Sequence, residues 1–332
     1  MFKLKTVLKF LILVFVLFTI FNAVYQVPFS QKIEYGVTFS PRFARYLKLD
    51  WKKTYQEMLD ELKVKNVRLT SYWDILQPEQ DKFDFSETDY LLSEAEKRGV
   101  RVILVLGERQ PRWPECHIPI WAKDLKLKDR QKKILEFIQK TVERYKNYPS
   151  VWAWQVENEP FLSFFGEGCD KADENFLKTE ISLVRSLSNK KIIISDSGEL
   201  GTWVVPMQAS DIFGTTIYRK VKDKFFGYVT YPVPPYFYSL KSGLIRKFFA
   251  PYNQKTIIVE LQSEPWLAGG DLISQAEQSK IFSVKDFKNY INFAGKTGFD
   301  EIYLWGVEWW YFMDKQGYPQ YLDYAKTLFR SY

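Results

Sequence analysis

The segment Arg101–Gly107 reads RVILVLG, and its pattern decides the fold. After the arginine, apolar residues follow one another without interruption, as in a strand that is covered on both faces. Leu91, Leu92 and Ala95 precede it at helical spacing, and a long amphipathic pattern that begins at Asp129 follows it. A buried strand between two helices predicts a parallel sheet with helices packed against it.

The same alternation of strands and helices continues along the chain. The stretch WAWQVENEP, residues 152–160, contains a fourth strand, and the other predicted strands are residues 35–39, 66–73, 101–107, 191–198, 212–219, 255–262 and 301–307. Eight strand–helix units predict an α/β fold, a (β/α)8 TIM barrel, over residues 27–332. A doubly wound open sheet is the alternative, but no glycine-rich phosphate-binding turn follows the first strand.

Residues 1–26 differ from the rest of the chain. Lys3, Lys5 and Lys9 precede an apolar run from Phe10 to Phe21, and the segment from Val7 to Tyr25 is just long enough to span a bilayer. We interpret residues 1–26 as a signal anchor in the membrane, with a cleaved signal peptide as the alternative. The lysines favour a cytoplasmic N-terminus, so we expect the barrel to be membrane-anchored on the extracytoplasmic side, or secreted.

Composition excludes several classes of partner and cofactor. The formal net charge is +7, but lysine pairs are scattered, which argues against a nucleic-acid partner. A single histidine, His117, excludes a multi-histidine zinc site. We therefore expect no metal, no cofactor, and a monomer. Cys116 and Cys169 fall in loops after the third and fourth strands, on one rim of an exported domain, and we predict that they form a disulfide.

In a barrel of this kind, residues at the carboxyl ends of the strands face the active site. WAWQVENEP ends in Asn158, Glu159 and Pro160, so the strand stops being apolar where it reaches this rim. Other strands end in further polar and aromatic residues: Arg68, Tyr72, Trp73, Glu108, Tyr218, Glu260, Gln262, Trp305 and Glu308. Rings stack on sugar faces and polar groups bind hydroxyls, so this set predicts a carbohydrate site.

A pair of carboxyl groups supplies a reaction for such a site. One carboxyl protonates the leaving oxygen of a glycosidic bond, and the second attacks the anomeric carbon or activates water. Glu159 and Glu260 lie about three strand–helix units apart, which places them across the mouth of the barrel. Glu264 is a rival nucleophile, but Glu260 ends its apolar run directly and is preferred.

These motifs resemble those of clan A of the glycoside hydrolases, over about residues 33–332. The resemblance rests on Asn-Glu-Pro after a strand, on Glu260 in IIVELQ, and on Trp305 at the end of the last strand. Residues 72–107 and the stretch PRWPE, residues 111–115, look like the β-galactosidase-like and cellulase-like families of that clan. Cellulase-like members commonly carry histidines around the reacting sugar, and the sequence departs from them in having His117 alone.

The resemblance implies a retaining glycoside hydrolase that acts on β-linked oligo- or polysaccharides without a cofactor. Matched by position, it makes Glu159 the acid/base and Glu260 the nucleophile. Asn158 would hold the sugar 2-hydroxyl, Arg68 and Tyr218 would orient the nucleophile, and Trp305 would form the platform under the reacting sugar. Trp73 and Trp113 are predicted as further substrate-contacting rings, with core packing as the alternative for each.

Three other functions stay open from the sequence. The chain can be a glycan-binding barrel without turnover, a transglycosylase in which a sugar replaces water as acceptor, or a tethered scaffold. The scaffold interpretation requires the aromatic insertion around residues 231–238 to be an exposed partner surface.

Overall fold

A computed structural model describes residues 32–162, 166, 168–223, 225–251, 253–267 and 273–330. The predicted signal anchor or signal peptide, residues 1–26, lies outside these residues. No helix in the described part of the chain has the length and apolar character needed to cross a membrane.

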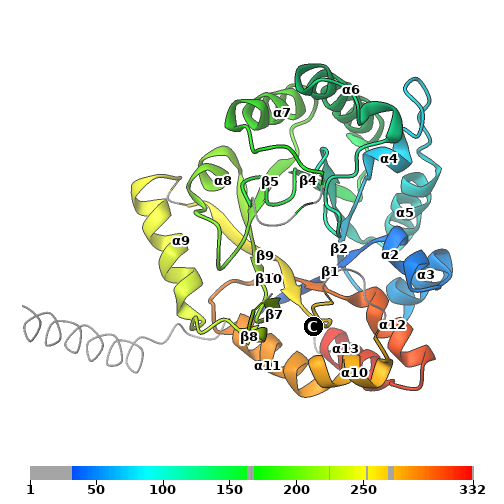
Figure 1. The fold of residues 1–332 in the computed structure, drawn as a ribbon, viewed down its shortest axis with the longest axis vertical. Coiled ribbons are helices and arrows are strands. Elements are labelled where there is room, and N and C mark those ends of the chain that lie inside the picture. Colours follow the sequence, from blue (N-terminus) through cyan, green and yellow to red (C-terminus); the bar gives the residue numbers. More distant parts are fainter. Residues whose placement is uncertain are drawn as a thin grey trace, which may run out of the picture.

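Parallel strands close into an eight-stranded barrel (Figure 1), in the order β1-β10-β9-β6-β5-β4-β3-β2. The barrel strands are β1 Glu34–Phe39, β2 Asn66–Leu69, β3 Arg101–Leu106, β4 Val151–Val156, β5 Lys191–Asp196, β6 Ile212–Ile217, β9 Lys255–Gln262 and β10 Glu301–Trp305. The predicted TIM barrel is therefore confirmed.

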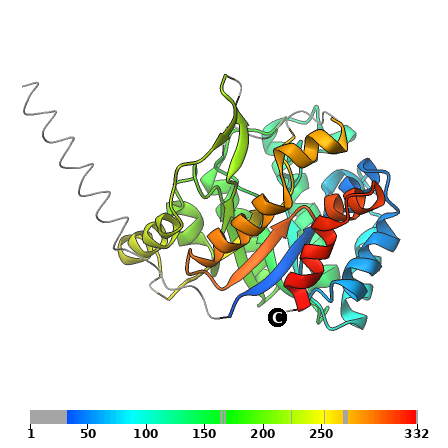
Figure 2. The same ribbon diagram turned by 90° about the horizontal axis from the view of Figure 1, so that it is seen from below.

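Helices surround the barrel, as Figures 1 and 2 show. They are α2 Pro41–Tyr46, α3 Trp51–Glu61, α4 Trp73–Leu76, α5 Ser86–Lys97, the 3-10 turn Ile120–Ala122, α6 Leu127–Tyr145, α7 Glu174–Leu187, α8 Val204–Ala209, α9 Tyr236–Phe248, α10 Gln275–Ile281, α11 Val284–Gly295, α12 Val307–Lys315 and α13 Gln320–Arg330. Local chemistry sets several of the boundaries. Asp50, for example, caps α3 by accepting from the backbone N–H groups of Lys52 and Lys53.

Two apolar layers hold the barrel together. A small cluster formed by side chains of six strands includes Ile103, Ala153, Ile193, Val259 and Tyr303, and it fills the barrel interior. A larger cluster lies between the strands and the helices. The strands are covered on both faces, which explains why RVILVLG has no polar alternation.

The structure departs from the sequence interpretation at the second strand. β2 ends at Leu69, four residues before the predicted end, and Trp73 begins α4. The reason is local, because the Tyr72 carbonyl accepts from the backbone N–H groups of Ile75 and Leu76 and so starts a helical turn.

The insertion between β6 and β9 also differs from the prediction. It forms a hairpin, β7 Lys220–Asp223 with β8 Gly227–Thr230, followed by α9. Tyr236 and Tyr238 are buried, and the Tyr238 hydroxyl donates to Glu199 at 2.6 Å. The expectation that residues 231–238 form an exposed aromatic surface is therefore wrong for Tyr236 and Tyr238.

Candidate active site

The chain leaves β4 through an unusual backbone turn. Glu157 and Glu159 both have left-handed backbones, with φ of 57° and 44°, which is uncommon for residues other than glycine. The Glu157 carboxylate stabilises the turn by accepting from the backbone N–H groups of Glu108 at 2.8 Å and Arg109 at 2.6 Å. Glu157 thereby fixes where Asn158 and Glu159 lie.

Arg68 is the centre of a buried network that joins three strands. Its guanidinium donates to Glu260 Oε1 at 2.6 Å, to Asn158 Oδ1 at 2.7 Å and to Gln155 Oε1 at 2.8 Å. The Arg68 side chain is fully buried. Because a guanidinium presents its donors in a rigid plane, these contacts fix Glu260 and Asn158 relative to each other.

The second oxygen of Glu260 is also occupied. Tyr218 donates its hydroxyl to Glu260 Oε2 at 2.6 Å. Each carboxylate oxygen of Glu260 thus accepts a strong donor, one from Arg68 and one from Tyr218, which fixes the orientation of the carboxylate. The structure brings Arg68, Asn158, Tyr218 and Glu260 together, as their positions in the sequence predict.

Glu159 lies next to this network. Its side-chain oxygen Oε1 accepts from Thr216 Oγ1 at 2.9 Å, and Thr216 is the register partner of Glu260 on the neighbouring strand. Burial raises the pKa of Glu159 well above its usual value, and the negative charges of Glu260 and Glu115 raise it further. Glu159 is therefore suited to hold a proton, and a protonated carboxyl can act as a general acid.

A third carboxyl group at the site was missed by the sequence analysis. Glu115 lies in the loop after β3 and pairs with Arg109, whose Nε and Nη2 donate to Glu115 Oε2 at 2.8 and 2.7 Å. Burial raises the pKa of Glu115, while Arg109 opposes the rise and Glu260 adds to it. Glu115 is the last residue of PRWPE, and this motif is the sequence signal that included it.

Trp305 ends β10, as predicted, but one face of its ring is covered. The Arg112 guanidinium carbon lies 4.0 Å from the Trp305 ring centroid, and only 9% of Trp305 is exposed. Arg112 forms ion pairs with Glu264 and, at 3.0 Å, with Glu308. The rival nucleophile Glu264 is thus engaged by Arg112, whereas Glu260 is held by Arg68 and Tyr218.

The other predicted aromatic residues differ in exposure. Trp73 is fully buried and packs edge-to-face on Trp121 at 5.6 Å between ring centroids, so its position does not support contact with a substrate. Trp113 is 66% exposed and is free to contact a ligand. His117 is buried, and burial, with Arg42 nearby, lowers its pKa to about 3. It is therefore neutral near pH 7 and has a structural role between Arg42 and the Arg112 carbonyl.

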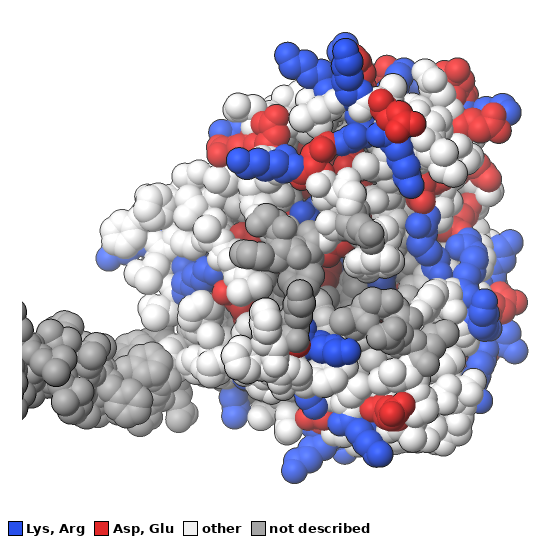
Figure 3. Space-filling view, viewed as in Figure 1, with Lys and Arg blue, Asp and Glu red and all other residues white. Residues whose placement is uncertain are grey.

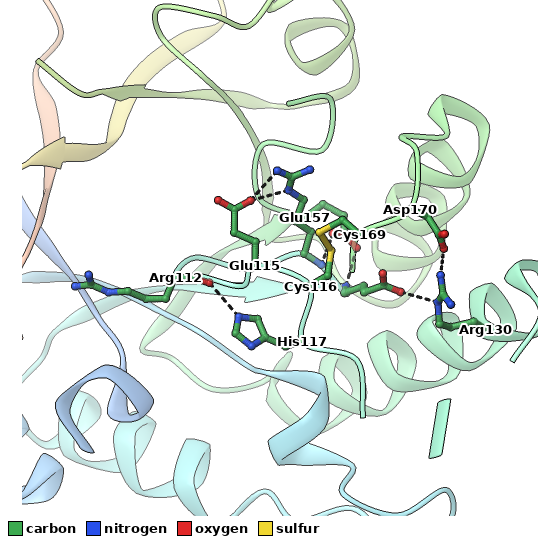
Figure 4. The surroundings of a disulfide bond; sticks show 10 residues. Arg112, Glu115, Cys116, His117, Arg130, Glu157, Cys169 and Asp170 are labelled. Atoms are coloured by element: carbon green, nitrogen blue, oxygen red, sulfur yellow. Dashed lines mark hydrogen bonds and ion pairs between the residues drawn. A yellow bond between two sulfur atoms is a disulfide. The ribbon is translucent and has the colours of Figure 1, made fainter. Parts of the chain in front are cut away.

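Cys116 and Cys169 form a disulfide with an S–S distance of 2.01 Å, so the predicted pairing is confirmed (Figure 4). The bond joins the loop after β3 to the loop after β4. Next to it, Arg130 pairs with Glu108 at 3.2 Å and with Asp170. The disulfide indicates an oxidising compartment.

Within the described residues, no group of three or more His, Cys, Asp or Glu side chains is arranged to hold a metal ion. Figure 3 shows positive and negative side chains mixed at the top and bottom of one face of the molecule, and Lys and Arg side chains gathered along its right-hand side. The same face is hollowed near its centre, where acidic side chains are visible. Carboxyl groups, arginines and aromatic rings are the chemistry that the described residues of the site offer.

Comparisons with known proteins agree with this chemistry. The sequence profile described as Glycosyl hydrolase family 10 matches residues 34–168. A "Beta-galactosidase LacZ" from Lactobacillus acidophilus is 23% identical over 163 residues, which is 43% of this chain and 24% of that protein. A second, from Heyndrickxia coagulans, is 21% identical over 180 residues, 48% of this chain and 26% of that protein. The chain thus aligns with about a quarter of the length of these curated relatives.

Solved structures share the fold. A β-galactosidase from Marinomonas ef1 superposes with a TM-score of 0.55 at 14% identity, covering 82% of this chain and 54% of that one. An endo-β-1,4-xylanase of glycoside hydrolase family 10 from Gloeophyllum trabeum gives 0.54 at 14% identity, covering 83% and 85%. A family 39 glycoside hydrolase from Bacteroides cellulosilyticus gives 0.51 at 16% identity, covering 85% and 58%. The chain therefore resembles the clan A glycoside hydrolases in sequence, over residues 34–168, and in fold.

Proposed function

We propose that this protein is a retaining glycoside hydrolase that cleaves β-linked glycans with Glu159 as acid/base and Glu260 as nucleophile. The observation that carries the proposal is that the Glu159 and Glu260 carboxyl groups have different surroundings. Glu260 has both oxygens held by Arg68 and Tyr218, whereas burial and neighbouring charge raise the pKa of Glu159. Two carboxyl groups in unlike environments are what an acid and a nucleophile require.

In the first step, a Glu260 oxygen attacks the anomeric carbon while Glu159 gives its proton to the leaving glycosidic oxygen. The bond to the leaving sugar breaks, and an ester bond to Glu260 forms. Glu260 loses its negative charge when this ester forms. One of the charges that raise the pKa of Glu159 is thereby removed.

In the second step, the ionised Glu159 takes a proton from water, and the water oxygen attacks the anomeric carbon and releases Glu260. Inversion at each step gives net retention. Asn158 would bind the 2-hydroxyl of the reacting sugar through its amide group, since its side-chain oxygen accepts from Arg68 at 2.7 Å. If a sugar replaces water in this step, the same site catalyses transglycosylation.

The names of the relatives, β-galactosidases and a β-1,4-xylanase, favour a β-linked substrate. Oligo- or polysaccharides are thus the proposed substrates. The apolar stretch at residues 7–25 and the disulfide favour an enzyme tethered to the membrane with its barrel outside the cytoplasm. We propose that the barrel acts as a monomer.

The proposal is tested by incubating the full-length protein with activated 2-fluoro-glycosides of galactose, glucose, mannose and xylose, followed by intact mass measurement and peptide mapping. We expect one glycosyl adduct, located on Glu260. An adduct on Glu264 would overturn the assignment of the nucleophile. Hydrolysis of matching aryl glycosides with inversion of configuration would overturn the retaining mechanism.

A further inference from the structure

Arg112 occupies an unusual position at the mouth of the barrel. Its guanidinium carbon lies between two rings, 3.7 Å from the centroid of Phe43 in α2 and 4.0 Å from that of Trp305 in β10. Figure 4 shows the side chain extending away from the disulfide. Arg112 is 8% exposed, although it comes from a loop at the rim.

Two carboxylates hold the guanidinium between these rings. Arg112 pairs with Glu264, which follows β9, and with Glu308 at 3.0 Å in α12. Glu308 in turn accepts from the backbone N–H of Ser40 at the end of β1. One side chain from the loop after β3 is therefore tied to the ends of β1, β9 and β10.

The sugar that stays on the enzyme after the first step is called the glycone. Arg112 lies on the glycone side of the barrel mouth. Glu159, the proposed acid, contacts β5 and β6, since its backbone N–H donates to Ser195 Oγ and its carboxyl accepts from Thr216. The leaving group departs next to the acid. Trp305, the proposed platform under the reacting sugar, instead ends β10 and lies against Arg112, whose partner Glu264 follows β9.

We infer that Arg112 closes the glycone side of the site, so that the enzyme accepts a single sugar unit there and removes sugars from the non-reducing chain end. The inference rests on the proposed glycosidase activity and specifies its substrate as a terminal β-linked sugar. A second glycone unit would have to pass Trp305 and displace a cation that is held by two carboxylates and two rings. Phe43 packs on this guanidinium and Glu308, which is buried, pairs with it.

The test uses aryl β-glycosides of galactose, glucose, mannose and xylose, together with aryl glycosides of the corresponding β-1,4-linked disaccharides. The full-length protein is incubated with each, and the first products are identified by mass spectrometry. From the disaccharide glycosides we expect free monosaccharide and aryl monosaccharide, with free disaccharide at least 100-fold less abundant. Free disaccharide as the main first product would overturn the inference while leaving the glycosidase proposal intact. Failure to cleave any glycoside would contradict both.

Two variants separate closure by volume from an effect of charge. R112A removes the side chain that closes the glycone side, and we expect the ratio of free disaccharide to monosaccharide to rise at least 10-fold. R112M keeps most of the side-chain volume without the charge, so its ratio is expected to stay within about twofold of wild type. R144M, which removes an arginine from the exposed pair with Asp89, is the matched distant control. If folded R112A, verified by its thermal unfolding transition, gives the wild-type ratio, Arg112 does not set the specificity. If R112A does not fold, the products that wild type releases from the disaccharide glycosides decide whether the glycone side accepts one sugar unit.

Discussion

At the residue scale, Glu159 and Glu260 are expected to respond differently to the same substitution. E159Q removes the proton donor, so turnover of an unactivated glycan should fall by roughly 10²–10⁴-fold. A 2,4-dinitrophenyl glycoside needs no protonation of its leaving group, and its first step should lose much less. E260Q removes the nucleophile and should abolish turnover of both substrates.

The measurement is kcat/KM, which reports the first step, for the two substrates in each variant, together with the burst of dinitrophenol. E159Q should show a burst followed by slow turnover, because its second step lacks a base. Equal losses of kcat/KM on both substrates in E159Q would exclude Glu159 as the acid.

The third carboxyl, Glu115, provides a prediction for the pH profile. Its negative charge raises the pKa of Glu159. The proposed mechanism requires a protonated Glu159 in the first step, so activity should be lost as pH rises through that pKa. E115Q removes the charge and lowers the pKa of Glu159. The alkaline limb of the kcat/KM profile should then move to lower pH by up to about one unit. Glu136 is exposed on α6, and E136Q, the matched control, should leave the limb in place. A limb that does not move in E115Q would contradict this electrostatic coupling.

The sequence predicts some of these residues and misses others for a physical reason. Arg68, Asn158, Tyr218 and Glu260 lie at or just beyond strand ends, and the barrel rule converts that position into proximity. Glu115 and Arg112 lie in a loop where both have left-handed backbones, with φ of 70° and 82°. Such a loop has no periodic pattern from which side-chain direction can be read.

At the scale of single elements, the disulfide between the loops after β3 and β4 should stabilise the barrel. It closes a segment with a sequence separation of 53 residues. Because a crosslink restricts the unfolded chain, the C116S/C169S double variant should lose about 2–4 kcal/mol in the free energy of unfolding. Chemical denaturation of both proteins measures this difference, with wild type under reducing conditions as the comparison. An unchanged free energy of unfolding would show that the bond does not contribute.

Some strand boundaries can be predicted from the sequence and others cannot. β9 begins and ends at the predicted residues, Lys255 and Gln262, because its apolar run is continuous and buried. The predicted second strand, in contrast, was too long, since Tyr72 and Trp73 have strand-like side chains but enter a helical turn at the rim. Trp73 was assigned to the site for the same reason. Its ring instead packs beneath α6 against Phe137.

At the scale of the whole molecule, the fold was predictable because the alternation of buried strands and amphipathic helices repeats eight times. Each unit adds one strand to the barrel, and closure follows from the number of units. The product pattern was not predictable, because it depends on how Arg112 from one loop meets Phe43 and Trp305 from two distant elements. Contacts of this kind exist only after the barrel has closed.

The last prediction concerns where the whole molecule resides. Lysines before and within the apolar stretch at residues 7–25 predict that the N-terminus stays in the cytoplasm and the barrel is exported. Full-length protein produced in bacterial cells should remain in the membrane fraction after alkaline carbonate washing, because a spanning segment resists extraction that removes peripheral proteins. In cells with a permeabilised outer membrane, added protease should digest the barrel, and its two cysteines should be unreactive toward a thiol reagent. Soluble protein that lacks residues 1–26 would instead establish a cleaved signal peptide. Barrel protein that is protected from protease and carries two reactive thiols would contradict export altogether.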